Sequence, residues 1–228
     1  AYVQTPVEAL AESSEQAEAA GPKGRFRPWE EIIPEFNYSD KSYFSLVVPT
    51  LDTVRYGFLM RSHVDSMTPL FFTGDTGTGK SVVAQSNMEL WSKPEEEGGA
   101  NVLPVMITFS GQTAAILVQS TIESKLEKKR KDLLGPPTGK KMIVLIDDAN
   151  MPAKEEYGAQ PPIELMRHLI CHGFLYDREK LFLKNVSDTL IFGAAAPPGG
   201  GRAEMTTRFS RHFHMLCMPP SDEAVLQA

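Results

Sequence analysis

The stretch Gly74-Asp75-Thr76-Gly77-Thr78-Gly79-Lys80-Ser81 matches the pattern G-x-x-x-x-G-K-[ST] of a phosphate-binding loop. An apolar segment, residues 69–73, precedes it, and a segment with helical spacing, residues 80–91, follows it. Glycines let backbone N–H groups converge on phosphate oxygens, and the following helix directs the positive end of its dipole at them. We expect the loop to bind nucleotide phosphates, with Lys80 reaching the β- and γ-phosphates and the Ser81 hydroxyl ligating Mg²⁺. The alternative is a glycine-rich strand-to-helix turn with a solvent-facing lysine.

Apolar and helical segments alternate on both sides of this loop. The apolar segments are residues 69–73, 102–109, 142–146, 189–194 and 212–218, and the helical ones are residues 80–91, 112–134 and 163–172. Strands separated by helices imply crossover connections and a mostly parallel sheet that is covered on both faces. The predicted fold class is therefore α/β.

Two carboxylates follow the apolar segment 142–146. A Mg²⁺ ion at a phosphate loop needs an acid at a neighbouring strand end, because hard cations take oxygen ligands and ligands gather at the carboxyl edge of parallel strands. We expect Asp147 to bind the metal. Asp148 stands where a glutamate would polarise the attacking water, but aspartate is one methylene shorter. Asp148 could instead simply cap the loop that follows it.

Arginines gather before the last apolar segment. Arg202 follows a glycine triplet, and Arg208 and Arg211 come shortly after it. In ring ATPases an arginine at this point projects toward the γ-phosphate of the next subunit, where its fixed charge stabilises the transferring group. A solvated basic turn in an acidic chain is the alternative.

Two further clusters predict no site. The basic residues Lys125, Lys128, Lys129, Arg130 and Lys131 are expected to form a solvated helix face rather than a nucleic-acid site. His168 and His172 are spaced i, i+4 on a helix, but nothing in the sequence supplies a third metal ligand, so we expect them to be structural.

Composition excludes several classes of protein. The chain has 228 residues and a net charge of −6, with 42% hydrophobic and 23% charged residues, which is typical of a folded globular protein. No apolar stretch reaches the ~18 to 20 residues of a membrane helix, and the acidic balance argues against nucleic-acid binding. The 2 cysteines form no C-x-x-C pair, which indicates a reducing compartment. We therefore expect a soluble protein.

The chain divides by composition into four parts. Residues 1–24 are rich in Ala and Glu, have helical spacing over residues 7–20 and are expected to be a linker or tail. Residues 25–68 form an aromatic-rich and proline-containing N-terminal segment, and residues 69–221 form the phosphate-loop core. Residues 222–228 begin a further connection. Because the sequence starts at Ala1 without a signal segment, we expect a piece of a longer protein.

Taken in order, four motifs make the chain resemble an AAA+ module, and specifically the third AAA+ module of an axonemal dynein heavy chain. The motifs are residues 48–56, residues 74–81, residues 147–152 with 157–164, and residues 196–202 with 208–213. The resemblance implies that Val48, Pro49 and Thr50 hold the adenine of ATP or ADP. It implies a five-stranded parallel sheet in the order 5-1-4-3-2. It also implies a helical lid after Ser221, which this sequence lacks, so we expect weaker nucleotide binding than in an intact ring module.

The resemblance implies a nucleotide-binding regulatory module of a microtubule-based ciliary or flagellar motor in the cytoplasm. Its partners would be neighbouring AAA+ modules of the same heavy chain, with microtubules bound through other parts of the motor and with neither nucleic acid nor membrane involved. Ala196 stands where AAA+ proteins place a water-orienting Asn or Thr, so hydrolysis is less expected than binding. A hydrolytically active ATPase module and a structural module with permanently bound nucleotide are the alternatives.

Overall fold

The structure is a computed structural model that describes residues 2–5, 25–36, 47–94 and 99–220. It divides into two compact units, Ala1–Phe58 and Leu59–Ala228, with the boundary inside helix α1, Leu51–Asp65. The helix expected in residues 7–20 and the connection expected in residues 222–228 lie outside the described residues. Within the described ranges, no helix has both the length and the apolar character needed to span a bilayer.

The first unit contains a small hairpin-like sheet. Strand β1, Tyr2–Thr5, pairs antiparallel with β2, Arg25–Pro28, and a short 3-10 helix η1, Trp29–Ile32, follows. The buried indole of Trp29 meets the ring of Phe58 edge-on at a centroid distance of 5.4 Å. The segment expected to be a linker thus contains a strand at its start.

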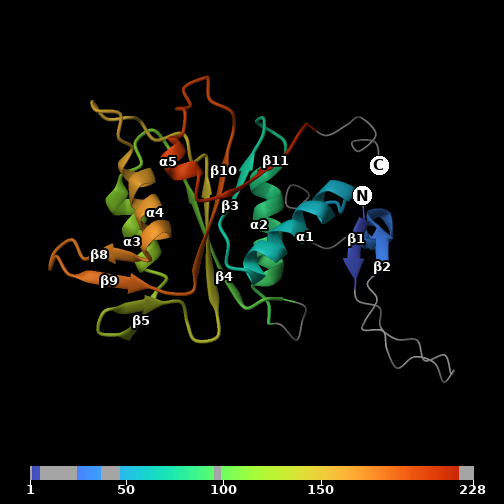
Figure 1. Ribbon diagram of the computed structural model, residues 1–228, viewed down its shortest axis with the longest axis horizontal. Coiled ribbons are helices and arrows are strands. Elements are labelled where there is room, and N and C mark those ends of the chain that lie inside the picture. Colours follow the sequence, from blue (N-terminus) through green and yellow to red (C-terminus); the bar gives the residue numbers. More distant parts are fainter. Residues whose placement is uncertain (1, 6–24, 37–46, 95–98, 221–228) are drawn as a thin grey trace. The chain divides into compact units, whose positions relative to one another are not determined.

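The second unit is built on a five-stranded sheet in which all neighbours run parallel. Its strands are β3 (Leu70–Thr73), β4 (Val102–Thr108), β7 (Lys141–Asp147), β10 (Thr189–Ala195) and β11 (His214–Cys217). Their spatial order is β11-β3-β10-β7-β4 (Figure 1). Numbered along the chain, this is the expected order 5-1-4-3-2, and the predicted α/β class is confirmed.

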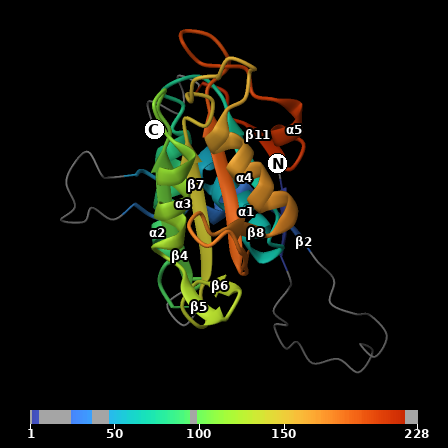
Figure 2. The ribbon, with the colours of Figure 1, turned by 90° about the vertical axis from the view of Figure 1, so that its left-hand side faces the viewer.

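Helices cover both faces of this sheet. Helix α2, Lys80–Trp91, lies on one face, and α3, Ala115–Glu123, lies beside α4, Pro161–His172, on the other (Figures 1 and 2). The central strand β7 is fully buried from Met142 to Ile146, as its uninterrupted apolar run predicts. A short helix α5, Thr207–Ser210, precedes β11. The carboxyl ends of β3, β7 and β10 therefore meet at one edge of the sheet.

The long helix expected over residues 112–134 is wrong, because α3 ends at Glu123. The remaining residues enter a second sheet with the order β5-β6-β9-β8. Its strands are β5 (Glu127–Arg130), β6 (Leu133–Gly135), β8 (Phe174–Tyr176) and β9 (Leu183–Val186). The basic cluster therefore lies around an exposed strand rather than on a helix face. Lysine and glutamate favour helices locally, but pairing with the distant β9 overrides that preference.

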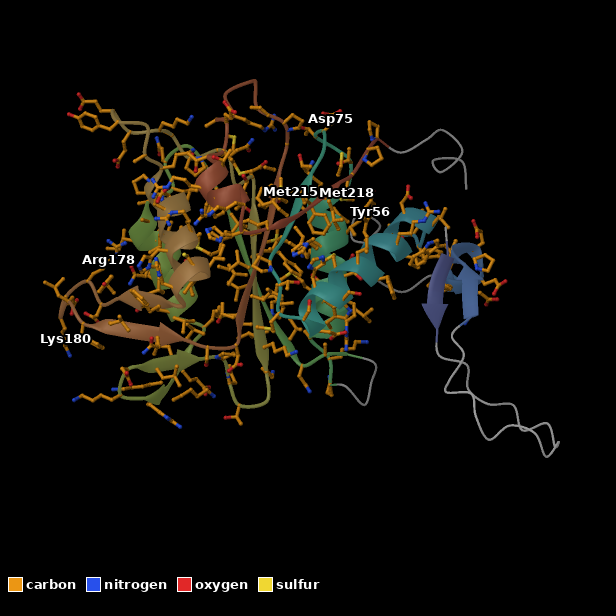
Figure 3. All side chains as sticks on the ribbon, viewed as in Figure 1. Tyr56, Asp75, Arg178, Lys180, Met215 and Met218 are labelled. Carbon is orange, nitrogen blue, oxygen red and sulfur yellow. The ribbon has the colours of Figure 1, made fainter. Side chains whose placement is uncertain are left out.

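Ion pairs attach the second sheet to α3. The Lys184 ammonium lies 2.9 Å from both the Glu123 and the Asp177 carboxylates. A hydrogen bond from the Lys180 backbone and one from Lys184 lower the pKa of Asp177 to about 2. Arg178 and Lys180 project from the same β8–β9 turn, well away from Asp75 on the phosphate loop (Figure 3).

The two histidines of α4 pack among aromatic rings. The rings of His168 and His172 are 4.8 Å apart, and His168 meets Phe174 edge-on at 4.6 Å. Among the residues that the structure describes, no group of three His, Cys, Asp or Glu side chains is placed to hold a metal. This packing agrees with a structural role for the pair.

Candidate functional site

The phosphate loop connects β3 to α2, as its sequence predicts. Gly79 takes a left-handed conformation at φ 83° immediately before the helix, and no side chain caps the first turn of α2. The open N–H groups of that turn are the donors that a phosphate needs. A Cβ atom at Gly74 would collide with the carbonyl oxygen of Met218, so only glycine fits beside the end of β11. Figure 3 shows Asp75 and Met218 at the same end of the sheet.

Lys80 folds back onto the loop. Its side chain is buried, and Nζ donates to the carbonyl oxygens of Gly74 at 2.9 Å and Asp75 at 2.6 Å. Burial lowers the pKa of Lys80, and the Arg202 charge lowers it further, while Asp147 and Asp148 oppose the shift. The ammonium therefore holds the loop in shape and stands where an incoming phosphate can replace carbonyl oxygens as its partner.

A cavity of about 290 Å³ opens between the loop and the strand ends. Its walls come from the loop and from the ends of β7 and β10, namely Thr76, Gly77, Gly79, Lys80, Ser81, Val82, Asp147, Asp148, Ala196 and Arg202. Small-molecule sites typically occupy ~300 to 1,000 Å³, so the volume suits the phosphate part of a nucleotide. Most of the predicted phosphate and metal residues are thereby brought together. The loop residues Gly74, Asp75 and Thr78 lie outside the lining and shape the loop instead.

The two acids occupy different positions at the end of β7. Asp147 is the last residue of the strand, and its Oδ1 accepts a hydrogen bond from the Asp148 backbone N–H at 3.0 Å. Asp148 adopts a left-handed conformation at φ 51°, which turns the chain sharply after the strand. Both carboxylates line the cavity with the Ser81 hydroxyl. Mg²⁺ is usually held by one or two carboxylates together with substrate phosphates, so this donor set fits the ion.

Two buried amides fix the loop after β7, and the sequence analysis did not single them out. Asn150 Nδ2 donates to the Ala196 carbonyl oxygen at 2.8 Å, and Gln160 Nε2 donates to the Pro152 carbonyl oxygen at 2.6 Å. Asn150 thus ties the loop after β7 to the end of β10. The sequence places Asn150 two residues after the acids that end a buried strand, but its partner lies 46 positions away, so no local pattern identified the bond.

The arginines separate into two groups. Arg202 lines the cavity of its own unit and donates from Nη2 to Thr76 Oγ1 at 3.2 Å. Arg208 and Arg211 are exposed and do not line that cavity, and Arg208 lies 4.0 Å from the Glu164 carboxylate. An arginine acting on another module's nucleotide must be accessible, and the exposure of Arg208 and Arg211 is compatible with that prediction. Arg202, by contrast, points at its own phosphate loop.

Val48, Pro49 and Thr50 fall in the first unit, immediately before α1. Thr50 caps that helix reciprocally with Thr53, since each backbone N–H bonds the other residue's hydroxyl, at 2.7 and 3.3 Å. Val48 is half exposed. The role of these residues in binding adenine stays a prediction.

The placement of Asp147 yields a specific expectation for Asp147→Asn. The exchange should weaken the Mg²⁺ dependence of nucleotide binding more than the binding of metal-free nucleotide, because only the metal contacts that carboxylate directly. Calorimetric titrations of ATP with and without Mg²⁺ measure both quantities. Equal losses under the two conditions would make Asp147 a structural residue, and Asp188→Asn, at a turn outside the cavity, is the matched control.

Comparisons with known proteins agree with this geometry. The family model for the P-loop containing dynein motor region matches residues 36–221. Dynein axonemal heavy chain 6 of Homo sapiens is 49% identical over 205 residues, covering 89% of this chain and 5% of that protein. Dynein axonemal heavy chain 12 of Mus musculus is 42% identical over 208 residues, covering 90% of this chain and 7% of that protein.

A third relative, dynein axonemal heavy chain 3 of Mus musculus, is 41% identical over 207 residues, covering 89% of this chain and 5% of that protein. The chain therefore spans only a small fraction of the length of these relatives. The family match extends over the phosphate loop, both acids and the arginines that follow β10. The chain belongs to the family of P-loop-containing dynein motor regions.

Proposed function

We propose that this chain is a regulatory AAA+ module that binds Mg²⁺ with ATP or ADP in the ring of an axonemal dynein heavy chain, at the third position. The observation that carries the proposal is the cavity in which Lys80, Ser81 and Asp147 meet. Lys80 supplies charge for the phosphates, and Ser81 and Asp147 supply oxygen ligands for the metal. The nucleotide state of this site would bias the mechanical coupling of the ring to its main hydrolytic site.

The assignment to a ciliary or flagellar motor rests on the relatives, whose names describe axonemal heavy chains. The partners would be neighbouring AAA+ modules of the same heavy chain, and microtubules would be bound by other parts of the motor. Arg208 and Arg211 would then act on the nucleotide of an adjacent module, since a finger supplied in trans works only across an interface.

A hydrolytically active module is the second candidate. The observation that favours it is the Asp148 carboxylate, which lines the cavity beside Asp147. An acid at this position can orient the attacking water if its reach suffices. The two candidates differ in whether the bound triphosphate is hydrolysed, so turnover is the property to measure.

We expect the chain to bind Mg·ATP and Mg·ADP while releasing phosphate at or near the background rate. Ala196 offers no polar side chain to a water, Asp148 is short, and Arg208 and Arg211 lie outside the cavity. Those features affect positioning and electrostatics, which account for nearly all of phosphoryl-transfer catalysis. Calorimetry measures the binding and a phosphate-release assay measures turnover.

The two measurements separate the candidates. A turnover of about 1 per second, within the normal range of enzymes, would establish the second candidate instead. Absence of binding to either nucleotide would overturn both candidates. The Lys80→Ala variant, measured in parallel, shows whether the observed binding or phosphate release comes from this site.

A further inference from the structure

The loop that follows β10 carries an arginine whose side chain has unused hydrogen-bonding capacity at the cavity. Arg202 Nη2 donates to Thr76 Oγ1 at 3.2 Å, and both residues line the cavity that contains Lys80. The Arg202 Nε–H is buried, and no partner for it is found among the described residues. Buried donors are normally paired, so an unpaired one beside a cavity is available to a ligand that binds there.

The backbone around Arg202 is held firmly enough to aim its side chain. The N–H groups of Gly199 and Arg202 each donate to the other residue's carbonyl oxygen, at 3.3 and 3.0 Å. The Ala203 N–H donates to the Asn150 carbonyl oxygen at 2.9 Å, and the Asn150 amide in turn holds the Ala196 carbonyl oxygen. The loop is therefore tied to the end of β7 on both sides of Arg202. This arrangement is unlike a loose basic turn in solvent.

The cavity carries charges of both signs. Lys80 and Arg202 bring two cations to its walls, and Asp147 and Asp148 bring two carboxylates. Burial is the main cause that lowers the pKa of Lys80, the two carboxylates oppose that shift, and Arg202 adds to it. A polyphosphate with its Mg²⁺ would pair with both sets of charges, the phosphates with the cations and the metal with the carboxylates. The planar guanidinium fork of arginine matches two phosphate oxygens in a way that a lysine point charge does not.

The position of Arg202 selects one phosphate of the nucleotide. The N–H groups at the start of α2 would hold the phosphates nearer the nucleoside, and Lys80 would reach toward the terminal ones. Strand β10 lies between β3 and β7, so its loop joins the wall that carries Asp147 and Asp148. Through Asp147 and Asp148, that wall would face a bound metal and the terminal phosphate. Ala196, from the same loop, has no polar side chain to offer there.

We propose that Arg202 donates hydrogen bonds to the terminal phosphate of a nucleoside triphosphate bound by its own chain, and so makes the site prefer triphosphate over diphosphate. This inference rests on the proposed nucleotide binding at the same cavity. It assigns Arg202 a role in cis, whereas the sequence pattern suggested that an arginine in this region reaches the next subunit.

The test compares the affinities of Arg202→Ala for a non-hydrolysable ATP analogue and for ADP, each with Mg²⁺, by calorimetry on the full chain. We expect the affinity for the triphosphate to fall by about 10- to 150-fold, as expected for a lost hydrogen bond to a charged group, while the ADP affinity changes less than about twofold. Arg202→Lys keeps the positive charge but lacks the planar guanidinium group. Its affinity for the triphosphate should therefore lie between those of the parent and the alanine variant. Arg130→Ala, on the exposed strand β5, removes an equal charge outside the cavity and should change neither affinity.

The outcomes are distinguishable. If the parent binds both nucleotides and Arg202→Ala weakens both equally or neither, Arg202 only supports the loop through Thr76 and the inference is overturned while the proposed function stands. If the parent binds neither nucleotide, the proposed function fails and this inference fails with it. Melting curves without nucleotide show whether each variant is folded, and Thr76→Val tests whether the loop contact alone alters selectivity.

Discussion

Lys80→Ala should lower the affinity of the chain for Mg·ATP and Mg·ADP by about 10- to 150-fold, because it removes charge-assisted hydrogen bonds worth about 1.5 to 3 kcal/mol. In the structure, the ammonium donates to two carbonyl oxygens of the loop at 2.9 and 2.6 Å. The variant should therefore lose both a contact to the phosphates and two hydrogen bonds that hold the loop in shape. Calorimetric titration measures the first loss, and thermal unfolding without nucleotide measures the second.

The matched control is Lys128→Ala, which removes the same charge from an exposed strand of the second sheet. It should leave nucleotide affinity unchanged, since charges separated by more than about one Debye length, ~8 Å at physiological salt, are largely screened. Equal affinities of Lys80→Ala and the parent would refute the site. A loss in both variants would mean that overall charge, and not the cavity, governs binding.

The parts of the fold that the sequence predicted are those whose signals are local. The buried run from Met142 to Ile146 is apolar without interruption, and the loop from Gly74 to Ser81 carries its own conformational requirements. Parallel strands then bring their carboxyl ends to one edge, so the sequence alone predicts that Asp147 lies beside the phosphate loop. The local sequence pattern and the rule that parallel strands end at one edge were sufficient to predict these elements.

The parts that the sequence could not predict depend on distant partners. Strands β5 and β6 form a hairpin, and β6 also pairs with β9, about fifty residues away, where the Leu134 carbonyl accepts from Ser187 N–H at 3.0 Å. Arg202 reaches Thr76 across 126 positions, and the loop before it contains three glycines whose path has no periodicity to read. Such contacts follow from the assembled sheet, and this is why the cis placement of Arg202 emerged only from the structure.

Phe71→Ala should lower the free energy of unfolding by about 3 to 5 kcal/mol, as expected for truncating a fully buried phenylalanine. Phe71 lies on β3, two residues before Thr73, and has no exposed surface. Its ring meets the ring of Phe213 edge-on at a centroid distance of 5.4 Å. It also lies over Gly193, which is its register partner on β10. Urea unfolding followed by fluorescence or circular dichroism measures the free energy of unfolding. If the alanine variant does not fold, Phe71→Leu is the milder substitution to measure instead.

The glycine at position 193 allows this packing to be tested by a double-mutant cycle. A Cβ atom at Gly193 would collide with the Phe71 ring, so Gly193→Ala alone should cost about 1 to 3 kcal/mol through overpacking. With Phe71→Ala already present, the new methyl group has room, and alanine also restricts the unfolded chain more than glycine does. The second substitution should then be neutral or stabilising, which gives a coupling energy of about 1 kcal/mol or more. Strictly additive losses would show that the ring does not occupy the space over Gly193. The core that places the phosphate loop beside Asp147 would then be packed differently from the arrangement described.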